Sequence, residues 1–132
     1  MIGLDTNVLV RYIVQDDPEQ SPRATSLMNS LSTKNPGYIT LVALVELVWV
    51  MKSCYKATRE EIFNVIDKLA RTNEICLENS ETVIKALRSF DASKADFSDC
   101  VIEHSALAAG CEFTATFDDG AANSAGMRLV VQ

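Results

Sequence analysis

Residues 1–10, MIGLDTNVLV, decide the fold of this chain, because they place a strand, an acid and a helix in direct succession. The apolar run at residues 1–4 predicts a buried strand, and residues 6–15 have the periodicity of a helix. A strand that passes into a helix with almost no loop is typical of the start of an α/β fold. Asp5 therefore stands where the first strand ends.

Strands and helices alternate along the rest of the chain. Thr58 and Glu61 form a capping box for a helix over residues 59–70, and Ser93 with Asp96 is expected to open another. The alternation predicts a three-layer α/β/α sandwich with a central parallel sheet of about five strands. After the first strand, the others are expected at residues 38–40, 74–77, 112–116 and 127–131.

Composition is that of a compact protein, with 132 residues of which 48% are hydrophobic. We expect one domain over residues 1–132. The longest apolar run, residues 41–51, is shorter than the roughly 20 residues of a membrane helix, so no membrane span is expected. An acid already at position 5 does not fit a secretory signal, which predicts a cytoplasmic protein. The four cysteines form no Cys-x-x-Cys pair, and this disfavours a zinc site.

The net charge of −6 restricts the partners of the chain. A general nucleic-acid binder neutralises phosphates with clustered Lys and Arg, whereas the 12 basic residues here are spread thinly. A polyanionic substrate would therefore need metal ions, a few placed residues such as Arg11, or a basic partner chain.

Four separated acids share an apolar setting: Asp5, Glu46, Asp99 and Asp118. Asp5 and Asp118 directly follow predicted strands, so both are expected at the carboxyl edge of the sheet, where ligands bind in α/β folds. Burial of an ionised carboxylate costs several kcal/mol, roughly. Repeated acids in apolar surroundings therefore predict a bound cation.

Each acid also has a simpler interpretation to be weighed. Asp5 is well placed to cap the first helix, and Asp118 is a good turn residue before Asp119 and Gly120. Asp96 is expected at the third position of the helix opened by Ser93, as part of its capping box. Glu46 and Asp99 have no such explanation in the sequence.

An all-oxygen set of ligands selects a hard cation, Mg²⁺ or Mn²⁺, and no calcium-binding loop is present. Such a site polarises a phosphoryl oxygen and activates water, which favours hydrolysis of a phosphodiester. His104 is the only histidine, so a pair of histidines for acid-base catalysis is excluded. Motifs for dinucleotides, nucleoside triphosphates and serine hydrolases are missing.

Four stretches carry a resemblance to a known family: LDTNVLVRYIVQDD, LVALVELVWVM, DFSDCVIEHSALAAGC and TFDD, in that order. Through them the chain resembles the PIN-domain nucleases, and among them the VapC-type toxins of toxin-antitoxin pairs. The resemblance implies a metal-dependent endoribonuclease in which Asp5, Glu46, Asp99 and Asp118 are catalytic and hold Mg²⁺ or Mn²⁺. It also implies an RNA substrate, a homodimer and a small VapB-like antitoxin as partners.

Further polar residues match the same pattern. Thr6, Asn7 and Thr116 look like the residues that position the four acids. Asp96 matches an additional acid of the family that supports the four metal ligands without being one of them. Arg11, one helical turn beyond Asn7, is the candidate for phosphate contact. Two other functions stay open: a non-catalytic binding module whose acids only cap helices, and a small-molecule phosphatase. The haloacid-dehalogenase type of phosphatase needs a second aspartate where this chain has Asn7.

Overall fold

The chain forms two compact units, Met1–Glu78 and Asn79–Gln132. The structure, a computed structural model, describes residues 1–131. Each unit has its own parallel sheet and its own helices. The expectation of a single domain over residues 1–132 stays a prediction.

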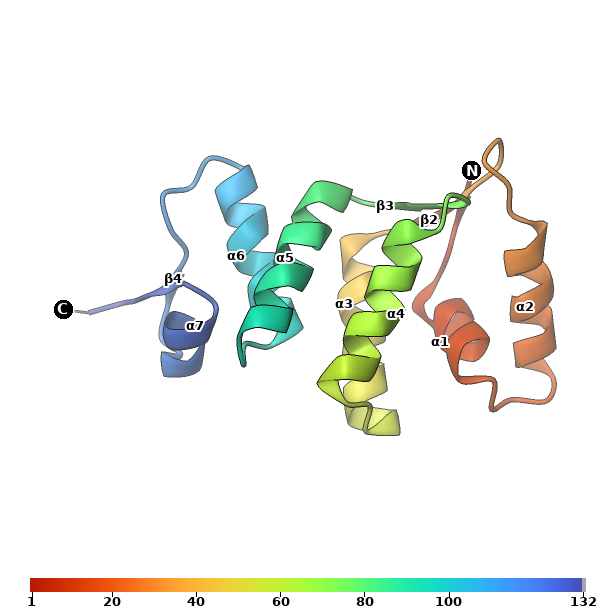
Figure 1. The fold of residues 1–132 in the computed structure, drawn as a ribbon, viewed down its shortest axis with the longest axis horizontal. Coiled ribbons are helices and arrows are strands. Elements are labelled where there is room, and N and C mark those ends of the chain that lie inside the picture. The colour runs from red at the N-terminus through yellow and green to blue at the C-terminus, as the bar shows by residue number, and fades with distance from the viewer. Residues whose placement is uncertain (132) are drawn as a thin grey trace. The chain divides into compact units, whose positions relative to one another are not determined.

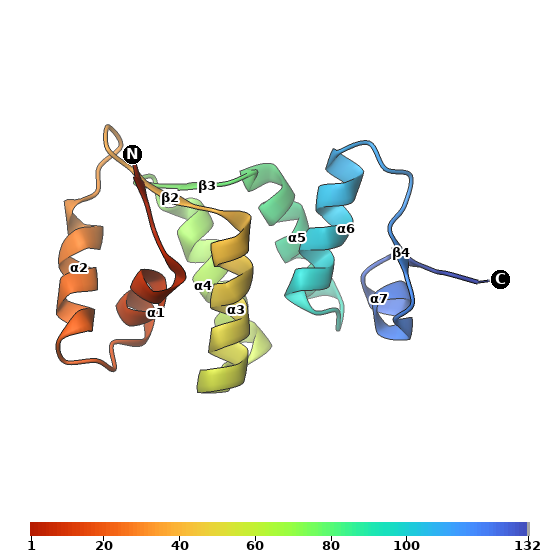
Figure 2. The same cartoon turned by 180° about the vertical axis from the view of Figure 1, so that it is seen from behind.

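The first unit contains three strands and four helices. Figures 1 and 2 show α1 beside α2 and α3 beside α4. The elements in chain order are β1 (Ile2–Gly3), α1 (Thr6–Val14), α2 (Gln20–Ser30), β2 (Gly37–Ile39), α3 (Leu41–Tyr55), α4 (Arg59–Arg71) and β3 (Ile75–Leu77).

The sheet of this unit has the order β1-β2-β3, and both pairings are parallel. Gly3 lies opposite Tyr38, and the ladder continues beyond β1 through a bond from Leu4 N to the Tyr38 carbonyl at 2.9 Å. Because the strands are parallel, their carboxyl ends share one edge. Asp5 and Glu78 follow β1 and β3 at that edge.

Apolar side chains from every layer of the first unit form its core. The side chains of Leu9, Ile39, Leu44, Leu47 and Ile66 are at most 1% exposed. They come from α1, β2, α3 and α4, so the helices are held together through the same apolar contacts that fix the sheet. Within residues 1–131, no helix is both long and apolar enough to cross a membrane.

As far as residue 131, the second unit consists of three helices and two short strands. Phe90 and Phe97 join α5 to α6 with an edge-to-face contact at 5.8 Å between ring centroids, and the Ser89 hydroxyl and His104 Nε2 are 2.7 Å apart. The two strands pair in parallel. The elements are α5 (Ser80–Ala92), α6 (Phe97–Ala108), β4 (Ala115–Thr116), α7 (Asp119–Ser124) and β5 (Arg128–Leu129).

The α/β class and the parallel pairing are confirmed, but the prediction of one sheet of about five strands is wrong for the described residues. Residues 1–131 contain five strands, paired as a sheet of three and a sheet of two. Three of the strands are only two residues long. Strands this short form few ladder hydrogen bonds, so the hydrophobic pattern that locates them does not determine their neighbours.

Helix ends were predicted with mixed success. The capping box of α4 is present: Thr58 Oγ1 accepts from Glu61 N at 3.1 Å, and Glu61 Oε1 accepts from Thr58 N at 2.9 Å. Gly110 follows α6 with φ 97°, a left-handed conformation in which glycine commonly ends a helix. The predicted start of α6 at Ser93 was wrong. Ser93 ends α5, and α6 begins only at Phe97.

Candidate functional site

Asp5 connects β1 to α1 and caps the helix. Its Oδ1 accepts a hydrogen bond from Thr6 N at 2.8 Å, and its own carbonyl accepts from Val8 N at 3.0 Å. β1 ends at Gly3, and both of its residues are exposed, so the expectation of a buried first strand is wrong. Leu4, which is 4% exposed, is the buried residue between β1 and Asp5. The cap occupies one carboxylate oxygen, so Asp5 retains a second oxygen that the cap does not use.

Glu46 lies in the middle of α3 and is tied to the beginning of α1. The Thr6 hydroxyl donates to Glu46 Oε1 at 3.1 Å, across 40 residues of sequence. Thr6 is therefore the link between the two predicted metal ligands of the first unit, since it bonds Glu46 and directly follows Asp5.

Burial was expected for all four predicted ligands, but only Asp99 is half-buried and the other three are exposed, which corrects one step of the sequence argument. Glu46 is exposed, and so are its helical neighbours Val42 and Trp49, at 71% and 63%. The buried face of α3 carries Leu44 and Leu47 instead. Because α3 is apolar on nearly all sides, its sequence does not indicate which face is buried.

Asp99, Asp96 and Asp118 interact electrostatically in the second unit. Asp99 is half-buried on α6, and this burial raises the pKa of its carboxyl above the usual range. The negative charges of Asp96 and Asp118 raise the pKa further. The unit thus concentrates like charges, which a bound cation would relieve.

Asp96 and Asp99 both lie three positions nearer the start of α6 than expected, because the helix begins at Phe97. Asp96 precedes the helix as its N-cap residue rather than lying at its third position. Asp99 occupies the third position, in the first turn, where the helix dipole favours a negative charge. Asp99 therefore has a structural explanation that the sequence did not suggest.

Asp118 is held between β4 and α7. Its backbone N–H donates to the Thr116 hydroxyl at 3.0 Å, and its Oδ1 accepts from Gly120 N at 2.8 Å as the cap of α7. Thr116 thus fixes the backbone from which the carboxylate projects. The cap again uses Oδ1 alone.

Two acids were missed by the sequence analysis. Glu78 follows β3 at the same sheet edge as Asp5, and its Oε1 accepts from Leu41 N at 2.9 Å, where α3 begins. Glu103 lies one turn after Asp99 on α6 and is only 9% exposed, with no hydrogen-bond partner for Oε2 in the part of the chain described. Two features of the sequence could have indicated these acids. Glu78 stands at the end of a predicted strand, and Glu103 follows Asp99 by four residues on a predicted helix.

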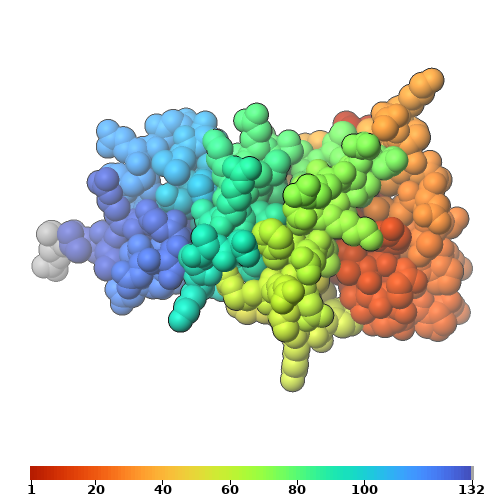
Figure 3. Space-filling view, in the orientation of Figure 1, coloured from red at the N-terminus to blue at the C-terminus, as the bar shows by residue number. Residues whose placement is uncertain are grey.

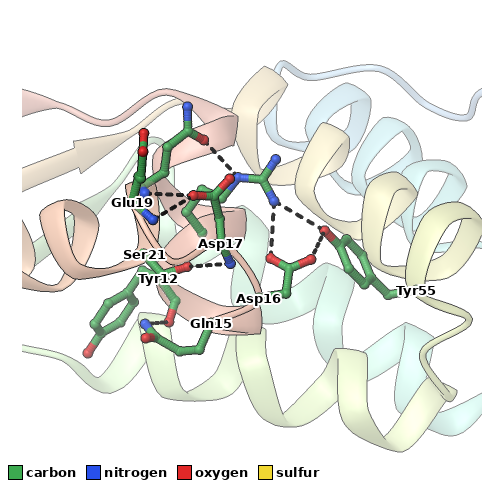
Figure 4. Close-up of polar contacts among 9 residues, drawn as sticks. Tyr12, Gln15, Asp16, Asp17, Glu19, Ser21 and Tyr55 are labelled. Atoms are coloured by element: carbon green, nitrogen blue, oxygen red, sulfur yellow. Dashed lines mark hydrogen bonds and ion pairs between the residues drawn. The ribbon is translucent and has the colours of Figure 1, made fainter.

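Arg11 belongs to a polar network that joins α1, α2 and α3 (Figure 4). Its Nη1 lies 3.1 Å from Asp16 Oδ1 and 3.4 Å from the Tyr55 hydroxyl, and its Nε donates to Gln20 Oε1 at 2.9 Å. Tyr55 donates to Asp16 Oδ2 at 2.9 Å, a bond that raises the pKa of the Tyr55 hydroxyl. The Arg11 guanidinium is therefore largely engaged within the protein.

The predicted ligands fall into two sets: Asp5 and Glu46 in the first unit, Asp99 and Asp118 in the second. As they stand, no three Asp, Glu, His or Cys side chains within residues 1–131 form a group that could hold a metal ion. The donor chemistry nevertheless fits Mg²⁺ or Mn²⁺, because all four predicted ligands are carboxylates and because the charges of Asp96 and Asp118 disfavour a negative charge on Asp99.

The sequence was compared with known protein families and with curated proteins. The sequence model described as "PIN domain" matches residues 2–126, nearly the whole chain and both of its units. The search of curated proteins finds no match.

Proposed function

The chain belongs to the PIN domain family, and on that premise we propose that it is a metal-dependent endoribonuclease that hydrolyses RNA phosphodiester bonds. PIN domains are generally nucleases, and they typically use divalent metals. Membership therefore supports a hydrolase that acts on nucleic acid. The choice of RNA and of Mg²⁺ or Mn²⁺ comes from the sequence motifs and is part of the proposal.

The observation that carries the proposal is the charge environment of Asp99. Burial and the charges of Asp96 and Asp118 all disfavour its ionised form. Asp99 and Asp118 stand at helix beginnings, but like charges close together still disfavour one another's ionised forms, and a bound cation would relieve this cost. A metal ion is the cation that best explains why a chain of net charge −6 keeps them together.

In this proposal Asp5, Glu46, Asp99 and Asp118 hold the metal, which would polarise the scissile phosphate and lower the pKa of a bound water. Thr6 keeps Glu46 in place through its 3.1 Å hydrogen bond. The remaining candidates position these acids without touching the metal: Thr116 bonds the backbone of Asp118, Asp96 stands before α6, and Asn7 is exposed on α1.

We propose further that the chain is the VapC-type toxin of a toxin-antitoxin pair in the cytoplasm, that it acts as a homodimer and that a small VapB-like antitoxin occludes the site. The support is the sequence resemblance together with the net charge of −6, which suits a basic partner. Because of this negative charge, a few positioned groups rather than a broad basic surface would bind the RNA phosphates.

A second function is favoured by specific bonds. Asp5 caps α1 and Asp118 caps α7, as a non-catalytic module whose acids only stabilise helices would require. Glu46 separates the two interpretations, because it lies in the interior of α3 and caps nothing. Its carboxylate instead accepts a hydrogen bond from the Thr6 hydroxyl at the beginning of α1.

The test is cleavage of an end-labelled RNA by the parent chain in Mg²⁺, with EDTA as the metal-free condition. We expect cleavage that requires Mg²⁺ and is lost in Glu46→Gln, while Glu60→Gln, an exposed acid of α4, retains it. Equal RNA cleavage by the two variants would contradict the proposal. Hydrolysis of a phosphomonoester without RNA cleavage would favour the phosphatase, and stability unchanged by Mg²⁺ would favour the non-catalytic module.

A further inference from the structure

A hollow of about 310 Å³ lies between α1 and α2, in the unit that carries Asp5. Figure 3 shows that α1 and α2, in red and orange, form one continuous surface. Polar side chains from both helices line the hollow, and Ala24, which is 6% exposed, lies in its apolar part. The polar side chains are Asn7, Arg11, Gln20 and Arg23.

The hollow begins next to the predicted metal ligand of the first unit. Asn7 is two residues after Asp5, and Arg11 is one further turn along the same helix. At 1.5 Å per residue, the stretch from Asp5 to Arg11 covers about 9 Å. A nucleic-acid strand that places one phosphate at Asp5 therefore has the hollow within reach of an adjacent phosphate.

The charges in the hollow leave one arginine uncompensated. Arg11 is paired with Asp16, and Asp17 accepts from the backbone N–H groups of Gln20 and Glu19, which lower the pKa of its carboxyl. Those bonds fix the Asp17 carboxylate at the beginning of α2. Arg23 is exposed, and no ion pair of Arg23 occurs among the described residues.

The amides of the hollow are suited to bind an anion. Because Arg11 Nε donates to Gln20 Oε1, the carbonyl of that amide is engaged and its nitrogen Nε2 is left to donate. Asn7 is exposed and supplies another amide donor. The α7 helix beside Asp118 carries no Lys or Arg, so it offers no comparable cation.

We propose that this hollow binds one phosphate of the RNA backbone beside the bond to be cut. Arg23 supplies the uncompensated positive charge, Asn7 and Gln20 donate from their amides, and Arg11 holds Gln20 in the orientation that allows this. The proposal rests on the proposed function, and it adds the residue that binds the substrate next to the metal. An arginine suits the task because its guanidinium binds phosphate through paired hydrogen bonds.

The test is the affinity for a fluorescent single-stranded RNA, measured by anisotropy over a series of salt concentrations. The parent for this measurement is the Asp99→Asn chain, which the proposed function predicts to be inactive, with Mg²⁺ present. Arg23→Ala is added to it, and Arg71→Ala is the matched control. Arg71 is exposed on α4, pairs with Asp67 at 3.0 Å and lies outside the hollow.

One phosphate contact to a single strand contributes about 0.7 to the salt slope, which corresponds to about fourfold in affinity at 0.15 M salt. We therefore expect Arg23→Ala to bind RNA about fourfold more weakly, with a shallower salt slope, and Arg23→Lys to restore part of the loss. Arg71→Ala should bind as the parent does. Unfolding temperatures equal to that of the parent exclude misfolding as the cause.

The outcomes separate this proposal from the function on which it rests. If the wild-type chain cleaves RNA and Arg23→Ala binds RNA with the affinity and salt slope of Arg71→Ala, the assignment of the hollow is overturned while the nuclease function stands. If neither the wild-type chain nor the Asp99→Asn chain binds RNA, both proposals fall together.

Discussion

Replacement of Gly37 by alanine tests how the sheet positions Asp5. A Cβ at this position would lie 2.7 Å from Leu4 Cδ1 and 2.9 Å from Leu31 Cδ1. Ordinary carbon contacts are about 3.5 to 4.0 Å, so both distances are roughly 1 Å too short. Leu4 and Leu31 are only 4% and 8% exposed, and neither can swing into solvent.

The expected cost follows from these distances. Overpacking of a core costs about 1 to 3 kcal/mol, and the gain from reduced freedom of the unfolded chain offsets about 0.4 to 1 kcal/mol of it. Gly37→Ala should therefore lower the free energy of unfolding by about 1 to 2 kcal/mol, a shift of roughly 1 M in the urea midpoint. Because Leu4 directly precedes Asp5, RNA cleavage should fall as well.

Gly3→Ala is the matched control for this experiment. Gly3 lies in the neighbouring strand β1, and an added Cβ would have no atom within 4 Å. We expect its urea midpoint to equal or slightly exceed that of the wild type. If Gly37→Ala unfolds at the same urea concentration as Gly3→Ala, then the contact between β2 and Leu4 does not fix the position of Asp5 as described.

Two further predictions concern helix caps and pH. Thr58→Ala removes one half of the capping box of α4 and should cost about 1 kcal/mol in urea unfolding, whereas no loss would exclude the box as a stabilising element. Asp99→Asn should stabilise the metal-free protein at pH 7 by less than about 1 kcal/mol, because the raised pKa of Asp99 makes its carboxylate destabilising as pH rises through that value. The difference in unfolding free energy should vanish below the ordinary pKa of aspartate, about 3.9, because the Asp99 carboxyl is then protonated in both the folded and the unfolded chain. A stabilisation that persists at that pH would contradict this explanation.

Local features of the fold were predictable from short stretches of sequence. The capping box at Thr58 and Glu61 involves residues three apart, so the sequence alone determines it. The transition from β1 to α1 at Asp5 is equally local. The start of α6 was not predictable in this way. The Ser93 hydroxyl donates to the Ser89 carbonyl and accepts from Ala95 N in the loop after α5, so the helix begins only at Phe97.

Features that depend on tertiary packing were not predictable. The apolar sequence of α3 contains no stripe that would indicate its buried face, and so the exposure of Glu46 and Trp49 was missed. The partners of short strands depend on contacts across many residues, and so five strands were expected in one sheet. The role of Arg23 depends on a hollow between two helices, which no spacing within α2 alone reveals.

The central claim, that acids of this chain hold a divalent metal, is tested most directly by calorimetric titration with Mn²⁺. The chains to compare are the wild type, Asp5→Asn from the first unit, Asp99→Asn from the second, and Asp91→Asn as the control on the exposed side of α5. We predict that Asp5→Asn and Asp99→Asn each weaken Mn²⁺ binding by more than about tenfold, while Asp91→Asn does not. Mn²⁺ binding of equal affinity in all four chains, or no binding by the wild type, would contradict the account.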